Sequence, residues 1–145
     1  MISHSIEIDR RPEDVFAYLD QPERHGEWQS QIVTTKVETE GPVGVGTRVR
    51  EIRRMGRREQ DTSYEITEHD PPRRSAFRGI VGPVRPVGSV AVEPAGDGSK
   101  ARVSVEFDLV GHGIGKLIAP LARMQARKSI VESQEQLKAK LEAGA

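Results

Sequence analysis

The chain has 145 residues, the usual size of a single domain, and its 22 basic residues balance 22 acidic ones, so its formal net charge is zero. A neutral chain with few aromatic residues argues against nucleic-acid binding, which relies on a basic surface and, for single strands, on stacking side chains. The absence of cysteine excludes disulfides, thiol nucleophiles and zinc–thiolate sites, and it favours a reducing, cytoplasmic setting.

The first predicted elements are one strand and two short helices. Isoleucines alternate with polar residues over residues 2–8, and this period of two predicts a half-buried strand. Pro12, followed by two acidic residues, suits the first turn of a short helix, and Pro22 begins a second one. The N-terminus has neither the basic start nor the apolar stretch of a signal peptide.

Further strands are predicted from residue 32 onward. Alternating and β-branched stretches are separated by turns that contain glycine or proline, and Asp97-Gly98 is the strongest hairpin signal among them. The predicted strands cover residues 32–37, 47–55, 60–68, 75–81, 87–93 and 101–109.

Residues 114–142 are predicted to form one long helix. Pro120 lies inside it and should either bend the helix or delay its regular start. Leu121, Ile130 and Leu137 belong to its apolar stripe, and we expect them to face the sheet. A sheet with one apolar face needs a cover, and only this helix is large enough to provide it. The predicted fold class is therefore α+β, with a curved antiparallel sheet of six or seven strands wrapped around a long C-terminal helix in one domain, residues 1–145. No apolar run approaches the roughly 18 residues of a membrane span, so no transmembrane segment is expected.

Two glycine-rich stretches resemble nucleotide-binding loops only in part. In GPVGVGT, residues 41–47, the dinucleotide fingerprint would need a third glycine where Val49 stands, and a helix after it. In GHGIGKL, residues 111–117, Val110 and Leu117 replace the glycine and the Ser or Thr of a phosphate-binding loop. We interpret the first as a tight strand connection and the second as a lead-in to the helix, and we expect no cofactor.

Six arginines between residues 48 and 58 form an arginine ribbon. Several of them must point to solvent, where acidic side chains of adjacent strands can pair with them. The alternative is an anionic partner such as a lipid head group, a carboxylated ligand or ribosomal RNA. The four histidines lie far apart without HxH or HxxxH spacing, so no metal site is expected.

The strand over residues 47–55 has two possible registers. If Val49 faces the interior, Glu51 and Arg53 do so too, whereas if Ile52 faces it, three arginines accompany that side chain. A bulge would let both apolar residues face inward. Otherwise at least one charged group points inward, where it must be paired, hydrated or near the surface.

The order of these elements, together with several short motifs, resembles the START-like or helix-grip superfamily, in particular its polyketide cyclase/dehydrase and lipid-transport branch. The resemblance runs from Ile6 to about Leu141. The residues that carry it are PEDVF at 12–16, Leu19, Pro22, Trp28, GVGT at 44–47, YEITEHDPPR at 64–73, Glu93-Pro94 and Asp97-Gly98.

The resemblance implies a ligand cavity between the sheet and the C-terminal helix. Inward strand positions and the helix stripe are expected to line it, namely Trp28, Val49, Tyr64, Phe77, Val90, Phe107, Leu121 and Met124. Each of these residues can also be plain core. Trp28 and Tyr64 are the better candidates, because each combines apolar surface with one polar group that needs a partner when buried.

Different classes of function remain open. We favour binding of a hydrophobic small molecule, such as a lipid, isoprenoid or polyketide, by a monomer or homodimer. The alternative is a polyketide cyclase or dehydratase, which needs a general base and a donor to the developing enolate, with Tyr64, Glu51 and His4 as candidates. A third class is a protein- or ribosome-interaction module that works through the arginine ribbon.

Overall fold

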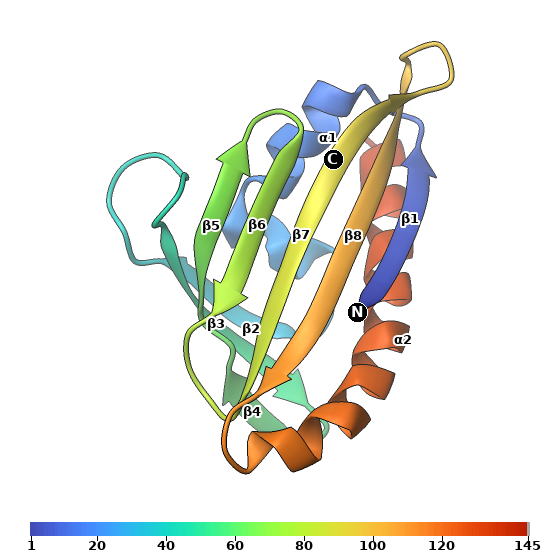
Figure 1. The fold of residues 1–145 in the computed structure, drawn as a ribbon. Helices are drawn as coiled ribbons and strands as arrows, with labels where there is room; N and C mark the ends of the chain where they lie inside the picture. Colours follow the sequence, from blue (N-terminus) through green and yellow to red (C-terminus); the bar gives the residue numbers. More distant parts are fainter. Residues whose placement is uncertain (145) are drawn as a thin grey trace.

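The computed structural model describes residues 1–144 (Figure 1). Eight strands form one antiparallel sheet in the order β1-β8-β7-β6-β5-β3-β2, and β4 pairs only with β3. The elements in chain order are β1 (Ile2–Ile8), α1 (Pro12–Leu19), the 3₁₀ helix η1 (Pro22–Glu27), β2 (Ile32–Val37), β3 (Arg48–Met55), β4 (Arg58–Asp61), β5 (Tyr64–Asp70), β6 (Arg74–Gly79), β7 (Val84–Ala95), β8 (Lys100–Gly111) and α2 (Gly115–Glu142).

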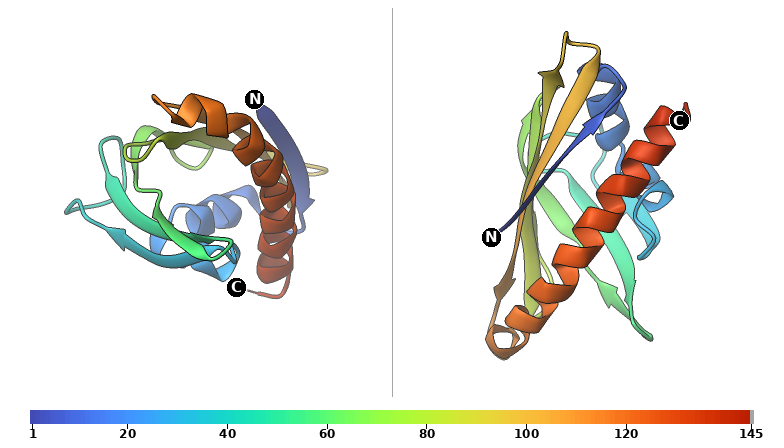
Figure 2. Two further views of the ribbon diagram at one scale, coloured as in Figure 1. Left: turned by 90° about the horizontal axis from the view of Figure 1, so that it is seen from below. Right: turned by 90° about the vertical axis from the view of Figure 1, so that its right-hand side faces the viewer.

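The sheet curls, and α2 lies along its concave side, while α1 lies toward the end opposite to the start of α2 (Figure 2). This arrangement confirms the predicted α+β helix-grip architecture. The sheet has one strand more than the upper prediction, because the strand expected over residues 60–68 is divided into β4 and β5. The Asp61 carboxylate accepts the Ser63 backbone N–H at 2.9 Å, and such a local bond turns the chain at the point of division.

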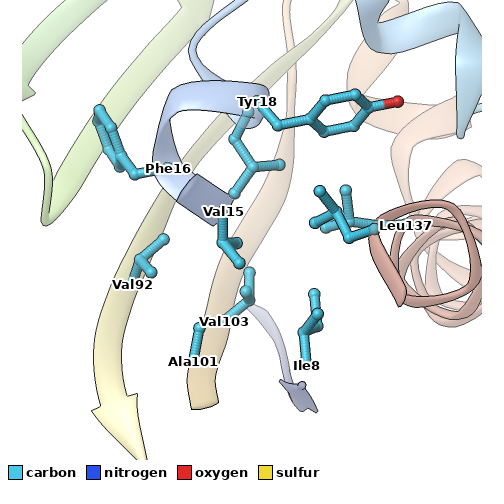
Figure 3. Close-up of a cluster of buried hydrophobic side chains, with 10 residues drawn as sticks. Ile8, Val15, Phe16, Tyr18, Val92, Ala101, Val103 and Leu137 are labelled. Carbon is cyan, nitrogen blue, oxygen red and sulfur yellow. The ribbon is translucent and has the colours of Figure 1, made fainter. Parts of the chain in front are cut away.

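The main hydrophobic core joins α1 and the last turns of α2 to the sheet (Figure 3). Val15 and Phe16 of α1 are buried because the apolar face of this short amphipathic helix packs against β7 and β8. Leu137 of α2 contributes from the other side and is only 1% exposed. The buried members of this cluster are Ile8, Val15, Phe16, Tyr18, Leu19, Val92, Ala101, Val103, Leu137 and Leu141.

The start of α2 differs from the prediction. Leu137 faces the core as expected and Ile130 is half-buried, but the expectation that Leu121 faces the sheet is wrong, because its side chain is 71% exposed. Ala119 is the buried residue in this turn, and a residue two positions later lies about 200° further round the helix. The apolar stripe of the sequence therefore splits into a buried line of small residues and an exposed line of large ones.

The glycine-rich stretch connects β2 to β3, as expected of a scaffold loop. The Gly46 N–H donates to the carbonyl of Ile66 in β5 at 2.8 Å, which attaches the loop to the sheet. The Thr47 hydroxyl is buried and accepts the Gly44 N–H at 2.9 Å. Gly46 has a φ of 89°, a conformation that favours glycine.

Among residues 1–144, no helix combines the length and the apolar character needed to cross a membrane.

Candidate functional site

The register of β3 turns one acidic side chain toward the concave side of the sheet. Val49 is fully buried and Glu51 is only 4% exposed, whereas Arg48 and Arg50 are exposed on the other face. Of the two registers that the sequence allows, the structure has the one in which Val49, Glu51 and Arg53 share the inner face. Glu51 is thus the carboxylate that this face has to accommodate.

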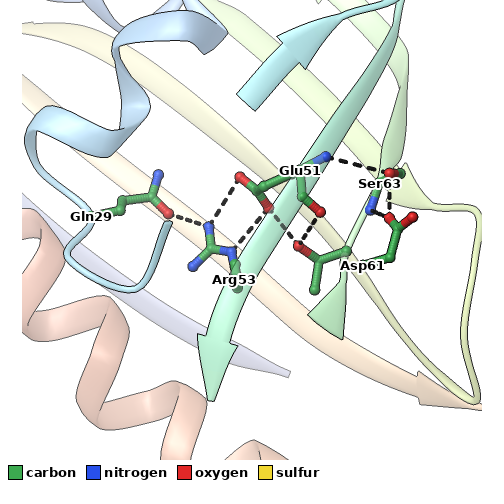
Figure 4. Close-up of polar contacts among 6 residues, drawn as sticks. Gln29, Glu51, Arg53, Asp61 and Ser63 are labelled. Carbon is green, nitrogen blue, oxygen red and sulfur yellow. Dashed lines mark hydrogen bonds and ion pairs between the residues drawn. The ribbon is translucent and has the colours of Figure 1, made fainter. Parts of the chain in front are cut away.

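Glu51 is satisfied by a small polar network (Figure 4). Arg53 Nε donates to Glu51 Oε2 at 2.9 Å, and the Thr62 hydroxyl donates to the same oxygen at 2.9 Å. Arg53 Nη2 also donates to Gln29 Oε1, which links β3 to the segment after η1. A buried carboxylate requires such partners, because removing an unpaired charge from water costs several kcal/mol.

Three buried polar atoms near this network have no hydrogen-bond partner among the described residues. They are Trp28 Nε1, Gln31 Oε1 and Thr35 Oγ1, one donor, one acceptor and one hydroxyl from a segment of eight residues. Thr35 is directly opposite Glu51 in the pairing of β2 with β3. Because buried polar groups are nearly always hydrogen-bonded, three such atoms in one segment indicate a place where water or the polar end of a ligand can bind.

Tyr64 extends the network into an aromatic layer. It is opposite Val49 in the register of β3 and β5, and its ring lies 5.2 Å from that of Phe77 between centroids. Burial, and next the negative charge of Glu51, raises the pKa of Tyr64 far above its ordinary value, so the hydroxyl stays protonated. Within residues 1–144 this hydroxyl makes no hydrogen bond to another side chain or to the backbone, which leaves it free to act as a donor.

A row of residues continues this layer across the concave face, where Ile66, Phe77, Gly88 and Phe107 are successive cross-strand partners. Gly88 allows the Phe77 ring to lie over β7, because a Cβ at this position would be 3.0 Å from a Phe77 ring carbon and 2.9 Å from the Glu106 carbonyl oxygen. The rings of Phe77 and Phe107 are 6.5 Å apart between centroids.

The apolar side chains in the middle of this face are incompletely covered. Phe77, Val90 and Phe107 are only half-buried, although they share a face with fully covered core residues. In the first half of α2, the residues with the least exposed side chains are small, such as Ala119, which is buried, and Ala126, which is half-buried. The concave face therefore keeps apolar surface that the described residues leave partly uncovered.

His25 belongs to the same region, although it is not among the predicted site residues. Its ring packs edge-on against Trp28 at 5.5 Å between centroids, and Nε2–H donates to the Leu19 carbonyl at 2.7 Å. Burial lowers the pKa of His25, a shift that the Leu19 carbonyl and the charge of Glu51 partly oppose. The imidazole is therefore neutral near pH 7, with Nδ1 available as an acceptor. No motif in the sequence marks this residue, because its role depends on where η1 places it.

We expect His25 to make the stability of the protein depend on pH. Its pKa is lower in the folded state than the value of about 6.5 in an unfolded chain, so the unfolded state binds more protons once the pH falls below that value. Its contribution to stability is complete above about pH 6.5 and is lost as the pH falls toward the folded pKa. Urea unfolding between pH 5 and 8 should show a steeper loss for the native chain than for His25→Gln. Equal slopes would contradict this assignment.

Of the remaining predicted residues, His4, Leu121 and Met124 lie away from the polar network. His4 binds Gln134 of α2 through Nδ1, and its strand β1 is at the opposite edge of the sheet from β2 and β3. Leu121 and Met124 are 71% and 68% exposed on α2. Trp28 is half-buried against the main core, beside the network. In the part of the chain that the structure describes, no group of three or more His, Asp or Glu side chains is placed to hold a metal ion.

Two surface hollows lie elsewhere. One, of about 310 Å³, is between α1 and the end of α2 and includes Arg10, Tyr18 and Arg24. The other, of about 430 Å³, lies over β1 and includes Glu7 and Arg102. Neither contains any of the eight residues predicted to contact a ligand.

Solved structures with the same fold come from several bacteria. The Zhui aromatase/cyclase from Streptomyces sp. R1128 is similar with a TM-score of 0.81 and 13% identity, covering 96% of this chain and 91% of that one. A START superfamily protein from Mycobacterium smegmatis has a TM-score of 0.77 and 12% identity, covering 99% and 98%. A conserved protein from Geobacillus kaustophilus has a TM-score of 0.73 and 17% identity, covering 95% and 92%. At these identities the likeness shows the fold alone.

Sequence comparison identifies the family. Among curated proteins no significant match was found. The family described as polyketide cyclase / dehydrase and lipid transport matches residues 1–142, nearly the whole chain. The chain therefore belongs to the polyketide cyclase/dehydrase and lipid transport family.

Proposed function

We propose that this protein binds a hydrophobic small molecule, such as a lipid, an isoprenoid or a polyketide, on the concave side of the sheet beneath α2. The apolar part of the ligand contacts Phe77, Val90 and Phe107, and its polar end is held near Glu51 and Tyr64. The family supports the general role, since its description covers both lipid transport and polyketide cyclisation.

The observation that carries the proposal is the combination of unpaired polar atoms with half-covered apolar ones. Trp28 Nε1 and Thr35 Oγ1 are buried without partners among residues 1–144, and Phe77 and Phe107 are large apolar side chains that the fold leaves half-exposed on its inner face. Binding sites for small molecules typically have this composition, a mostly apolar lining with a few polar groups that orient the ligand. A ligand would complete both sets of contacts at once.

The burial and the contacts of Glu51 favour ligand binding over catalysis. A general base must be within reach of the proton that it removes, whereas Glu51 is only 4% exposed and its Oε2 is bound by both Arg53 and Thr62. A cyclase is the second candidate, and the specific observation that favours it concerns His25 and Tyr64. His25 is neutral and Tyr64 protonated, as a base and a donor to an enolate must be, and the charge of Glu51 influences both.

Ligand binding should change the fluorescence of Trp28, the only tryptophan. We expect oleate and 1,8-dihydroxyanthraquinone, an apolar chain and a polycyclic phenol, to quench or shift its emission with saturation. Tyr64→Phe should weaken binding by about 0.5–1.5 kcal/mol, the contribution of one neutral hydrogen bond. In a cyclase that uses the hydroxyl, the same variant should instead slow turnover of a poly-ketone by about 100-fold or more with nearly intact binding.

Tyr18→Phe is the matched control. The Tyr18 hydroxyl donates to Glu27 at 2.9 Å and lies in the hollow beside α1, so its removal should leave ligand binding unchanged. If neither probe changes the emission of Trp28 and neither binds by calorimetry, the proposed site is wrong and a role of the outer surface becomes the better explanation.

A further inference from the structure

The first half of α2 carries an apolar surface that no part of the described chain covers. Leu117, Leu121 and Met124 are 80%, 71% and 68% exposed. Their spacing of i, i+4 and i+7 places them on one face of the helix, opposite the side that carries the buried Ala119. Ile114 is also exposed, at the N-cap of the helix. A contiguous face of this kind indicates an interaction surface, because isolated apolar residues are common but lines of them are not.

The charged residues on this half of α2 have one sign. From Leu109 to Val131 the chain contains no Asp or Glu, but it contains Lys116, Arg123, Arg127 and Lys128. Arg123 is bound to Asp108 at 2.7 Å, whereas the other three cations are exposed and form no ion pair among residues 1–144. The chain as a whole has no net charge, so the positive charge of this segment is a local excess.

The β3–β4 hairpin adds further cations at the same end of the molecule. Its tip and the start of α2 are both at the lower end in Figure 1 and in the right-hand view of Figure 2. Met55 is 43% exposed there, and Arg57 and Arg58 are exposed without an ion pair in the described part of the chain. Apolar side chains flanked by unpaired cations are thus found on two separate elements at this end.

We propose that this end of the protein docks onto an anionic phospholipid surface, with Leu117, Leu121 and Met124 entering the interface and the surrounding cations binding lipid phosphates. Amphipathic helices with a basic border bind membranes in this way, through buried apolar area and attraction to anionic lipids. A second copy of the chain fits less well. A twofold contact would bring the same patch against itself, and Lys116, Arg127 and Lys128 would meet cations without an acidic partner in the patch.

Vesicle flotation with the purified full chain tests the proposal. We expect binding to vesicles of 70% phosphatidylcholine and 30% phosphatidylglycerol, little binding to pure phosphatidylcholine, and loss of binding in 0.5 M NaCl, which screens exposed charges. The triple variant Lys116→Gln, Arg127→Gln, Lys128→Gln should reduce partitioning on the order of 100-fold, since each cation near such a surface contributes roughly fivefold. A control triple variant, Lys36→Gln, Lys100→Gln, Lys140→Gln, removes three exposed lysines elsewhere and should have much less effect.

A fluorescent label locates the contact, and the absence of native cysteine makes the labelling specific. An environment-sensitive dye on Leu121→Cys should shift to shorter wavelength when anionic vesicles are added, whereas the same dye on Ala139→Cys, an exposed position near the other end of α2, should not. Equal shifts at both positions, equal binding to neutral vesicles, or a dimer in solution that blocks the labelled face would each overturn the proposal. The result is independent of the fluorescence of Trp28 with soluble ligands, so this proposal and the proposed function can fail separately.

Discussion

Replacing Leu137 by alanine should lower the free energy of unfolding by about 2–5 kcal/mol, the usual cost of truncating a fully buried leucine. The side chain is 1% exposed and belongs to the cluster that joins α1 and the end of α2 to β1, β7 and β8. Its removal therefore leaves a cavity in the main core. Leu121→Ala is the matched control on the same helix. At 71% exposure it should change stability by no more than about 0.5 kcal/mol.

Chemical denaturation of the two variants at one pH measures this difference directly. A large loss for Leu121→Ala, similar to that for Leu137→Ala, would mean that α2 is rotated about its axis from the orientation described above. Such a result would also remove the basis for membrane docking, because the exposed face would then be part of the core.

Replacing either partner of the ion pair between Glu51 and Arg53 should lower the free energy of unfolding, but by different amounts. Arg53→Met leaves the buried Glu51 carboxylate with only Thr62 as a side-chain partner, and we expect a loss of about 3 kcal/mol or more at pH 7. Glu51→Gln leaves Arg53, whose side chain is 26% exposed and can reach water, so its cost should be clearly smaller, about 1–2 kcal/mol.

A double variant separates this explanation from a loss of packing. If the cost of Arg53→Met comes from the unpaired Glu51 carboxylate, the double variant Glu51→Gln, Arg53→Met should be more stable than Arg53→Met alone, because no unpaired charge is left buried. Urea unfolding of the two single variants and the double variant at pH 7 provides the measurement. A double variant that is less stable than either single variant would contradict the role assigned to this pair.

The fold could be predicted because its signals are local and repeated. The alternation of residues 2–8, the turn at Asp97-Gly98 and the helical period after residue 114 each specify one element, and their order resembles one known architecture. The face of α2 could not be predicted, because periodicity shows which residues share a face but not which face meets the sheet. Periodicity favours the line of large apolar residues that includes Leu121 as the buried one, whereas the structure buries the line of small residues that includes Ala119.

The candidate site was predictable only in part. The sequence indicates that β3 must turn charge inward in either register, but the choice of Glu51 depends on the pairing of β3 with β2 and β5, which links distant residues. Tyr64 could be proposed from its chemistry and its family position. His25 and the unpaired Thr35 hydroxyl could not, because their importance comes from what surrounds them in space.

The central claim is that an apolar ligand binds on the concave face of the sheet, and intermolecular nuclear Overhauser effects test it most directly. The experiment uses the chain with ¹³C-labelled Leu, Val, Met and Phe side chains and unlabelled 1,8-dihydroxyanthraquinone. We predict contacts from the probe to Phe77, Val90 and Phe107, which the fold places together on the inner face. Contacts confined to Leu117, Leu121 and Met124 on the outside of α2, or no contacts at a saturating concentration of the probe, would contradict the account.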